Sequence, residues 1–596
     1  MRPFRLFSAL LLCGGAVATA GGGPGGRPGC EPVVFDPDSK VKYRGIRRNG
    51  IEVFLNIPYG QGTGGANRFK PPRAFAPRPG STIDARSYGP ACPQPLSNDT
   101  APLAVSSVSE ISEDCLNLNV ARPSGMHGHH HHRGLLPVLV YIHGGGFWSG
   151  QNRELTIAPD GMILESVANG LPIIHVAMNY RLGVFGFAQS DALKSEGSEN
   201  AGLRDQRLAI EWVRDNIAYF GGDPEKITIS GQSSGGLAVG MQIMAYGGAK
   251  PAPFQQGICE SQALEPGITA NFTINAFRLV AEAAGCNASE LHTPETIACL
   301  RSLDTAAVQG AAESTYVSDI AHNIGDIWLP VVDGDFLPEA PSMLLDTGKF
   351  ANVTTMMGWC EDDVAYFTDT AIATPEDTRA FVQSYVPTVS PANVDALLSL
   401  YPPAEFAPNP AANLSAEFYR ASRVFRDILM VCEPVRYAAV LAAAGNTAYL
   451  YDWNQTILDP IIAASGGPSG LGVVHTSEFA YVWGNLSHYD LAGNGFAPTP
   501  ADHALVRRGS RSWSTFVSTG KPGLGGRDTF QGFGPALPAG ADGGSDQAWS
   551  LFVAGGPDEG FSAVDGPGSK PAVAAQKLRE RCKYINSAEI IEQIRF

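Results

Sequence analysis

The sequence lacks an excess of basic residues. Its 42 lysines and arginines are outnumbered by 58 aspartates and glutamates, which gives a formal net charge of −16. Proteins that bind nucleic acid or an anionic membrane surface present basic faces that release counterions. We therefore expect no nucleic-acid partner, and we interpret the acidic balance as a source of solubility.

Long hydrophobic runs are also absent. No segment reaches the roughly 20 consecutive apolar residues of a transmembrane helix. The shorter apolar run Phe7–Val17 follows two arginines and precedes Ala-Thr-Ala at 18–20, which is the pattern of a secretory signal peptide. The charged C-terminus carries no lipid-anchor signal. The sequence predicts a signal peptide over residues 1–20, a flexible Gly/Pro-rich leader over 21–30, and a secreted, extracellular protein with no stable membrane anchor.

The sequons and cysteines are consistent with the predicted secretion. Ten cysteines are present, and nine remain after the predicted signal peptide, so at least one has no intramolecular partner. Spacing does not fix the pairing, although Cys92/Cys115 and Cys286/Cys299 are close enough to close local loops. Seven N-x-S/T sequons are candidate glycosylation sites, namely Asn98, Asn271, Asn287, Asn352, Asn413, Asn454 and Asn485.

The sequence does contain a strand, a tight turn and a helix around one serine. Residues 226–241 read KITISGQSSGGLAVGM, and positions 231–235 fit the G-x-S-x-G nucleophile elbow. Glycines suit a strained, crowded turn, and the N-terminus of the following helix favours a developing negative charge. Ser233 is the predicted nucleophile.

A second glycine-rich loop, HGGGF at 143–147, follows an apolar run. It is either a plain loop or, as we interpret it, the oxyanion-hole loop of lipases and esterases. Apolar runs alternate with a helical period over Asn200–Tyr219, which predicts a largely parallel sheet. The expected strands are Val41–Tyr43, Ile51–Leu55, Leu116–Ala121, Leu135–Ile142 and Leu171–Met178.

Longer motifs resemble the type-B carboxylesterase, cholinesterase and fungal lipase family. They are SEDCLNLNV (112–120), YIHGGGF (141–147), NYRLGVFGF (179–187), AGLRDQRLAIEWV (201–213), FGGDPEKITISGQSSGG (220–236) and PVVDGDFLP (330–338). The resemblance implies one α/β-hydrolase domain over 31–596, with a large, mixed, mostly parallel sheet, flanking helices and helical cap insertions. It also implies a serine esterase acting on small-molecule esters without metal or organic cofactor, similar to secreted fungal carboxylesterases.

The same resemblance implies the remaining site residues. The family's histidine motif is similar to GVVHTSEF (472–479) and its acid motif to MGWCEDDVAYF (357–367). These place His475 as general base and Asp363 as the acid. The family more often carries Glu at the acid position, so Glu361 and Asp362 remain alternatives. By position, the backbone N–H groups of the oxyanion hole belong to Gly145, Gly146 and Ser234.

Family pairing also applies to the cysteines. Cys92–Cys115 and Cys286–Cys299 resemble two family loop disulfides, and Cys432–Cys582 resembles a third that occurs in some members. Cys30, Cys259 and Cys360 are left without an assigned partner. We expect Cys360 to be a buried thiol.

Departures from the family pattern narrow the range of expected substrates. The Cys92–Cys115 loop lacks the tryptophan that holds choline in cholinesterases, and Gln232 stands where those enzymes place a glutamate. Choline esters are therefore not expected substrates. The loop is also shorter and more polar than the lid of long-chain lipases, which argues against interfacial activation. A lipase and a non-catalytic adhesion module remain alternatives to an esterase, although the intact Ser233, His475 and glycine loop disfavour the second.

Several segments receive no catalytic assignment. Asn271–Ile320 and Thr374–Ala444 are Ala-rich and helical in pattern, so we expect a cap and flanking helices. Gly520–Asp546 reads as a surface excursion before a last helix around Val573–Tyr584. The histidine tract, His127 and His129–His132, fits a solvated loop better than a metal site. Five aromatic residues either line an apolar pocket or pack in the core, namely Phe147, Trp148, Trp359, Tyr366 and Phe367. The natural ester and the oligomeric state are not predicted.

Overall fold

The computed structural model describes residues 31–97, 103–125, 134–263, 265–319, 327–490, 497–538, 540–541 and 548–596. The expected signal peptide and leader, Cys30, Asn98 and the histidine tract lie outside the described residues.

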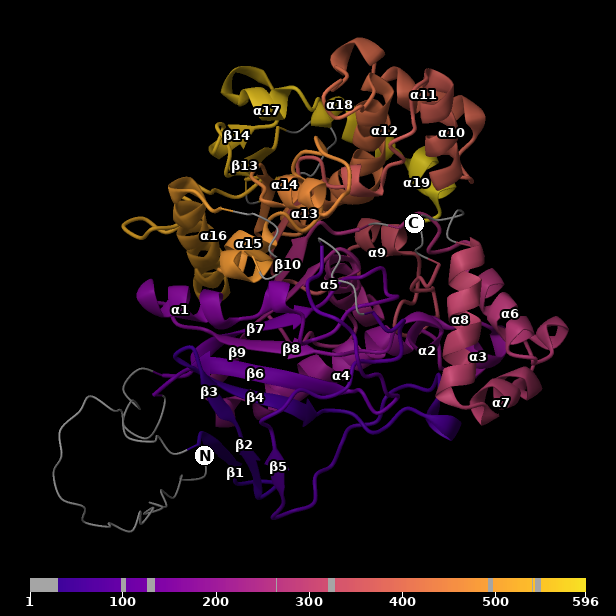
Figure 1. Ribbon diagram of the computed structural model, residues 1–596, viewed down its shortest axis with the longest axis vertical. Helices are drawn as coiled ribbons and strands as arrows, with labels where there is room; N and C mark the ends of the chain where they lie inside the picture. Colours follow the sequence, from indigo (N-terminus) through magenta and orange to yellow (C-terminus); the bar gives the residue numbers. More distant parts are fainter. Residues whose placement is uncertain are drawn as a thin grey trace.

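An eleven-stranded sheet forms the centre of the fold (Figure 1). Its strand order is β14-β13-β12-β11-β10-β9-β7-β8-β6-β4-β3, with parallel pairing from β13 to β8 and antiparallel pairing at both ends. The strands are β3 Ile46–Arg48, β4 Ile51–Pro58, β6 Asn117–Pro123, β7 Leu136–Ile142, β8 Ile174–Met178, β9 Gly222–Gln232, β10 Gln256–Glu260, β11 Thr354–Cys360, β12 Ala448–Trp453, β13 Ser550–Ala554 and β14 Gly560–Ala563. A three-stranded sheet joins β1 Val33–Asp36, β2 Val41–Arg44 and β5 Thr82–Asp84. The predicted mixed, mostly parallel sheet is confirmed.

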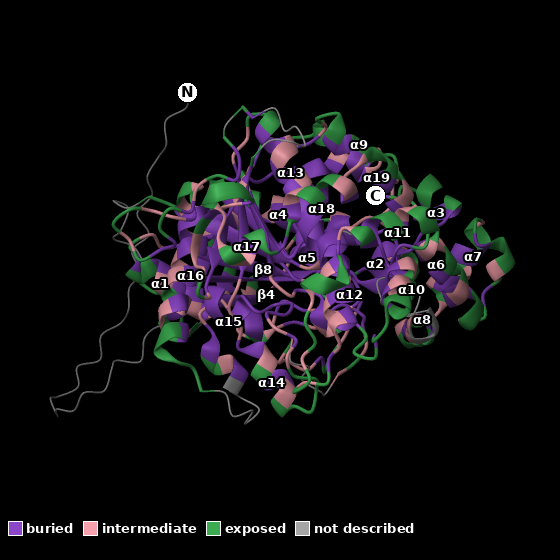
Figure 2. Cartoon of the chain, turned by 90° about the horizontal axis from the view of Figure 1, so that it is seen from above, coloured by how far each residue is buried: buried purple, intermediate pink, exposed green. Residues whose placement is uncertain are grey.

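Both faces of the sheet are buried, which explains why its strands read as continuous apolar runs. In β7, Val138 and Val140 belong to one hydrophobic cluster, whereas Leu139 and Tyr141 belong to another, because successive side chains point to opposite faces. Helices α4 Ala201–Asn216 and α5 Ser234–Met244 cover one face, and α1 Asp160–Ala168 and α16 Pro500–Thr519 cover the other. Figure 2 shows the buried residues concentrated along the sheet and the inner sides of these helices.

Two helical groups follow β10 and β11, where the sequence predicts the cap and flanking helices. The first contains α6 Phe272–Ala283, α7 Pro294–Ser302 and α8 Thr305–Asp319; the second contains α10 Pro375–Tyr385, α11 Pro391–Ser399, α12 Ala416–Arg426 and α13 Cys432–Ala443. They occupy separate regions beside the sheet in Figure 1. The shorter helices are α2 Gly183–Phe187, α3 Asp191–Ser195, α9 Pro341–Asp346, α14 Leu458–Ala464 and α15 Phe479–Val482.

Two expected elements differ from the structure. The last helix, expected around Val573–Tyr584, is divided into α17 Pro571–Ala574 and α18 Leu578–Ile585, followed by α19 Ala588–Ile594. Lys577 interrupts it with a left-handed backbone at φ 50°, which a helix cannot continue through. The strand expected from Leu171 begins only at Ile174, because Pro172 has no N–H to donate to a neighbouring strand.

Three disulfides join Cys92 to Cys115, Cys286 to Cys299, and Cys432 to Cys582. These are the pairings implied by the family resemblance. Cys259 on β10 and Cys360 on β11 are buried free thiols, as expected for Cys360. In the part of the chain that is described, no helix has the length and apolarity needed to cross a membrane.

The sequons differ in exposure. Asn271, Asn287, Asn352 and Asn413 are exposed and Asn454 is half-buried. Asn485 is only 3% exposed, and its Nδ2, the atom that would carry a glycan, donates a hydrogen bond of 2.7 Å to the carbonyl of Ala158. The fold therefore leaves Asn485 without the access that a glycan needs.

Candidate active site

Ser233 lies in the turn between β9 and α5. Its backbone has φ 60° and ψ −128°, a conformation that costs an L-residue energy and clusters at functional sites. A Cβ on Gly235 would lie 2.3 Å from the carbonyl oxygen of Ile142, and one on Gly231 would lie 2.3 Å from that of Gly235. The elbow therefore needs both glycines, and it leaves Ser233 partly exposed.

Asp363 and His475 are held together beside this turn. Asp363 follows β11, and its Oδ1 lies 2.5 Å from His475 Nδ1. The backbone N–H of His475 donates to the Asp363 carbonyl at 3.0 Å, and the backbone N–H of Cys360 donates to Asp363 Oδ2 at 2.9 Å. Both side chains of the pair are buried. An Nδ1–H donated to the carboxylate leaves Nε2 of the neutral imidazole as a proton acceptor.

The two alternative acids point elsewhere. Asp362 Oδ2 accepts the backbone N–H of Val473 at 3.1 Å, and Asp362 Oδ1 faces Arg423 at 3.6 Å. Burial, and then the charge of Asp362, raises the pKa of Glu361. Within the described residues no hydrogen bond joins either carboxyl to His475. Of the three candidate acids, the structure brings Asp363 to the histidine.

Gln232 and Phe367 also contact the imidazole of His475. Gln232 Nε2 lies 2.9 Å from His475 Nε2 and 3.4 Å from Nδ1. An atom so near both ring nitrogens lies over the ring rather than along the Nε2 lone pair. Phe367 packs edge-on at 5.4 Å between ring centroids. No hydrogen bond links Ser233 Oγ to His475 among the described residues, as is common in apo hydrolases, and the Nε2 lone pair stays available to the serine.

The glycine loop after β7 lies against the elbow. A Cβ on Gly144 would lie 2.5 Å from the Gln232 carbonyl oxygen and 3.0 Å from Ser233 Cβ. Gly145 and Gly146 have φ 106° and 61°, and the N–H of Phe147 donates to Ser234 Oγ at 3.2 Å. The amides of Gly145 and Gly146 donate to no described residue. They and the first amide of α5, that of Ser234, remain the candidate donors for an anion near Ser233.

The five aromatic residues divide between core and site. Phe147 and Trp359 are buried, and Phe147 packs on Phe187 at 4.6 Å. Trp148 stacks on Tyr316 of α8 at 4.4 Å. Tyr366 is half-buried and packs against Phe367, which is 38% exposed. Of these five residues, Phe367 both contacts His475 and has an exposed surface.

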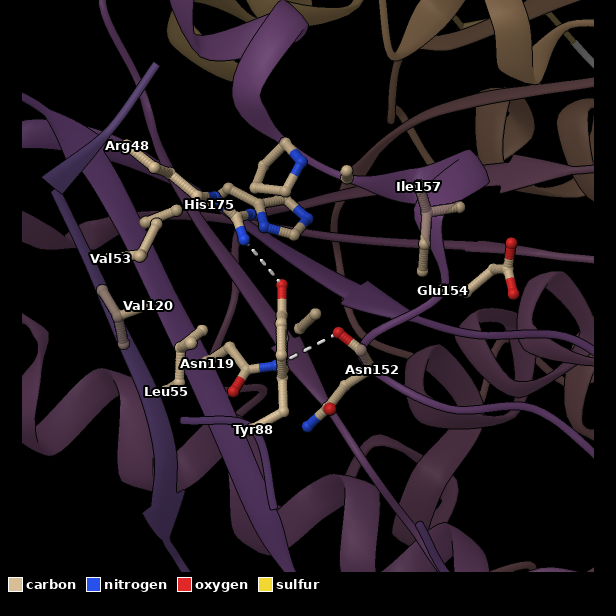
Figure 3. Close-up of a pocket in the computed structure, with 14 residues that line it drawn as sticks. Arg48, Val53, Leu55, Tyr88, Asn119, Val120, Asn152, Glu154, Ile157 and His175 are labelled. Atoms are coloured by element: carbon tan, nitrogen blue, oxygen red, sulfur yellow. Dashed lines mark hydrogen bonds between the residues drawn. The ribbon is translucent and has the colours of Figure 1, made fainter. Parts of the chain in front are cut away.

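The lining of the cavity in Figure 3 does not include Ser233, Asp363 or His475, and it combines apolar strand residues with Arg48, Tyr88, Asn152 and His175. Tyr88 accepts a hydrogen bond from Arg48 at 2.9 Å. Burial lowers the pKa of His175 to about 3 and that of His143, beside the glycine loop, to about 4. Both imidazoles are therefore neutral structural groups.

The sequence shows Gln232 as a missing charge but gives no sign of its contact with His475. Nor does it single out two buried glutamates beside the site, Glu260 and Glu478. Glu260 pairs with Gln232 across β9 and β10, and its carbonyl accepts the N–H of Ser233 at 2.9 Å. The ESQ run at 260–262 and the ionisable residue three positions after His475 were the available signals.

Comparison with known proteins identifies a family. The sequence profile of the carboxylesterase family matches residues 39–542. A secreted lipase of Arthroderma benhamiae is 53% identical over 566 residues, which cover 95% of this chain and 96% of that protein. An inactive carboxylesterase-like protein of Byssochlamys spectabilis is 34% identical over 82% of this chain and 84% of its own length.

A solved structure has the same fold. The crystal structure of Aspergillus niger EstA superimposes with a TM-score of 0.72, covering 95% of this chain and 99% of EstA at 24% identity. This likeness places the described sheet and helices in the α/β-hydrolase fold that the family resemblance implies.

Proposed function

The chain belongs to the carboxylesterase family, and we propose that it is a secreted carboxylic ester hydrolase with Ser233 as nucleophile, His475 as base and Asp363 as acid. The hydrogen bond of 2.5 Å between Asp363 and His475, beside a serine on a strained elbow, carries the proposal. Membership alone does not make a protein catalytic, since one relative is named inactive. The assignment therefore depends on the site.

Acylation begins at Ser233. A serine hydroxyl is a weak nucleophile until a base removes its proton. His475 Nε2 takes that proton as Ser233 Oγ attacks the ester carbonyl, while Asp363 keeps the proton of Nδ1 in place and stabilises the imidazolium. The contact of Gln232 with the ring face leaves this transfer unobstructed.

The attacked carbonyl oxygen becomes an oxyanion. The N–H groups of Gly145, Gly146 and Ser234 are its proposed donors, and the loss of one such donor typically costs about 10²–10³ in rate. His475 then returns the proton to the leaving alcohol. Water, activated by the same histidine, releases the acid from Ser233 and restores the hydroxyl.

A lipase is the second candidate, because the relative with 53% identity is named a secreted lipase. The described parts of the Cys92–Cys115 loop favour an esterase, because hydrogen bonds hold them beside the glycine loop, whereas the lid of an interfacially activated lipase has to move. Gln94 exchanges two hydrogen bonds with the backbone of Gly150, at 2.7 and 2.9 Å. Glu154 accepts the backbone N–H groups of Val105 and Ser106, at 2.9 and 3.1 Å.

Hydrolysis of p-nitrophenyl esters from acetyl to palmitoyl tests both candidates, with Ser233→Ala as control. An esterase gives a maximum at short chains that the substitution abolishes. A maximum at long chains, with a rise above the solubility limit of the substrate, supports the lipase. An absence of turnover at every chain length contradicts both.

A further inference from the structure

Two glutamates are buried behind the triad. Glu260 ends β10, and Glu478 precedes α15, three residues after His475. Both have no exposed surface. An isolated buried carboxylate is costly unless donors satisfy its oxygens. The mechanism above uses neither side chain.

Each glutamate has one oxygen with a donor and one without. Trp513 Nε1–H donates to Glu260 Oε1 at 2.5 Å, and the thiol of Cys360 donates to Glu478 Oε2 at 3.0 Å. Glu260 Oε2 and Glu478 Oε1 are buried and have no hydrogen-bond partner among the described residues. The orphan oxygens are thus one on each carboxyl.

The two carboxyls lie on the same face of the sheet, because Glu260 pairs with Gly358 of β11, two residues before the Cys360 whose thiol donates to Glu478. Burial, and then the charge of Glu478, raises the pKa of Glu260 well above its usual value. Burial, and then the charge of Asp363, raises the pKa of Glu478 to about 7. Like charges in one buried place cannot both ionise cheaply, whereas a protonated carboxyl can donate to a carboxylate. A proton kept by one of the two carboxyls therefore removes the second buried charge and supplies a donor for an orphan oxygen.

We propose that Glu260 and Glu478 share one proton, so that the pair carries a single negative charge behind the triad, and that Glu478 is a positioning residue for Asp363. The second part rests on the proposed function. Cys360 makes the connection, because its thiol donates to Glu478 and its backbone N–H donates to Asp363 Oδ2. The negative charge favours the imidazolium that forms when His475 takes the serine proton.

The titratable groups that face the pair come from all sides. They are Tyr141 of β7, Cys259 of β10, Cys360 of β11, Tyr451 of β12, Tyr489, and the triad members Asp363 and His475. Burial raises the pKa of every one of these tyrosines and thiols. They stay neutral in the working pH range, so the charges in this region are those of the carboxyls and the imidazole.

Infrared difference spectroscopy on the full chain tests the shared proton without use of the activity. The variants are Glu260→Gln, Glu478→Gln and the double variant. In each single variant the glutamine N–H can donate to the remaining carboxylate in place of the shared proton. One shared proton predicts that each single variant loses the same protonated-carboxyl band and that the double variant loses no more. No loss in any variant, or twice the loss in the double variant, overturns the proposal. If the double variant does not fold, the single variants decide, since two different bands, or none, contradict sharing.

The pH profile of kcat/KM tests the positioning role. Each single variant keeps one charge and is expected to keep the acid limb. The double variant removes the charge and is expected to shift the acid limb to lower pH by about 0.5–1 unit. Glu433→Gln is the matched control, because Glu433 is also a buried glutamate whose pKa burial raises to about 7. A lower kcat with an unmoved limb in the double variant would indicate a structural role and overturn the positioning claim, leaving the infrared result to decide the shared proton.

Discussion

At the scale of single residues, the site depends on which carboxyl orients His475. Asp363 does so through its side chain at 2.5 Å and through its backbone carbonyl at 3.0 Å. The neighbouring Asp362 is occupied by the backbone N–H of Val473. Adjacent acidic residues in one turn thus have separate tasks that their spacing in the sequence does not reveal.

Asp363→Asn is expected to lower kcat by about 10³–10⁴, because an amide can hold the imidazole in the wrong tautomer. Asp362→Asn and Glu361→Gln are expected to stay within a few-fold of the wild type. Steady-state hydrolysis of a short-chain p-nitrophenyl ester measures all three. The largest loss at position 361 or 362 would contradict the assignment.

Gln232→Glu is expected to move the acid limb of kcat/KM to higher pH by about one unit. A carboxylate against the ring stabilises the imidazolium, so the base becomes protonated at a higher pH. Gln232→Met, which keeps the length of the side chain without a charge, controls for packing and should leave the limb in place. An unmoved limb in Gln232→Glu would show that the contact with His475 seen here does not persist in solution.

At the scale of elements, the elbow and the glycine loop are packed backbone against backbone. Gly144→Ala is expected to lower kcat by about 10²–10³, because its Cβ would lie 2.5 Å from the Gln232 carbonyl oxygen and displace the proposed oxyanion donors. Gly310→Ala on α8 is the matched control, since nothing lies within 4 Å of the added Cβ. Wild-type kcat in Gly144→Ala, measured with the same ester series, would refute the close approach.

Local patterns predicted the strand, turn and helix around Ser233 because hydrophobic period and glycine placement act over a few residues. The resemblance to a family supplied what is distant in sequence, including His475 and the Cys432–Cys582 pair. The division of the last helix at Lys577 was not predicted, since a left-handed backbone there has no signal in the sequence. The contacts of Gln232 with His475 and of Cys360 with Glu478 depend on which strands become neighbours, and no local pattern specifies that.

At the scale of the whole molecule, buried carboxyls tie stability to pH. Burial is the largest cause that raises the pKa of Glu199, Glu433 and Asp452 to about 7, from ordinary values of 4.5, 4.5 and 3.8. The folded protein therefore binds more protons than the unfolded chain between about pH 4 and 7. Protonation of these carboxyls therefore stabilises the folded state. The stabilisation is complete below the pKa values of the unfolded chain and is lost as the pH rises through about 7.

The free energy of unfolding is thus expected to be larger at pH 5 than at pH 8. Denaturant midpoints at the two pH values measure it, and Glu433→Gln should reduce the difference by removing one of the groups. A higher midpoint at pH 8, or no effect of Glu433→Gln, would contradict this account.

Ser233 is the residue that we expect to form the acyl-enzyme. The most direct test is labelling with a fluorophosphonate, followed by peptide mass spectrometry and parallel measurement of ester hydrolysis. We expect one label per chain, on Ser233, with activity lost in proportion to labelling and no label in Ser233→Ala. Hydrolysis that continues while Ser233 is fully labelled, or a label on another residue that abolishes activity, would contradict it.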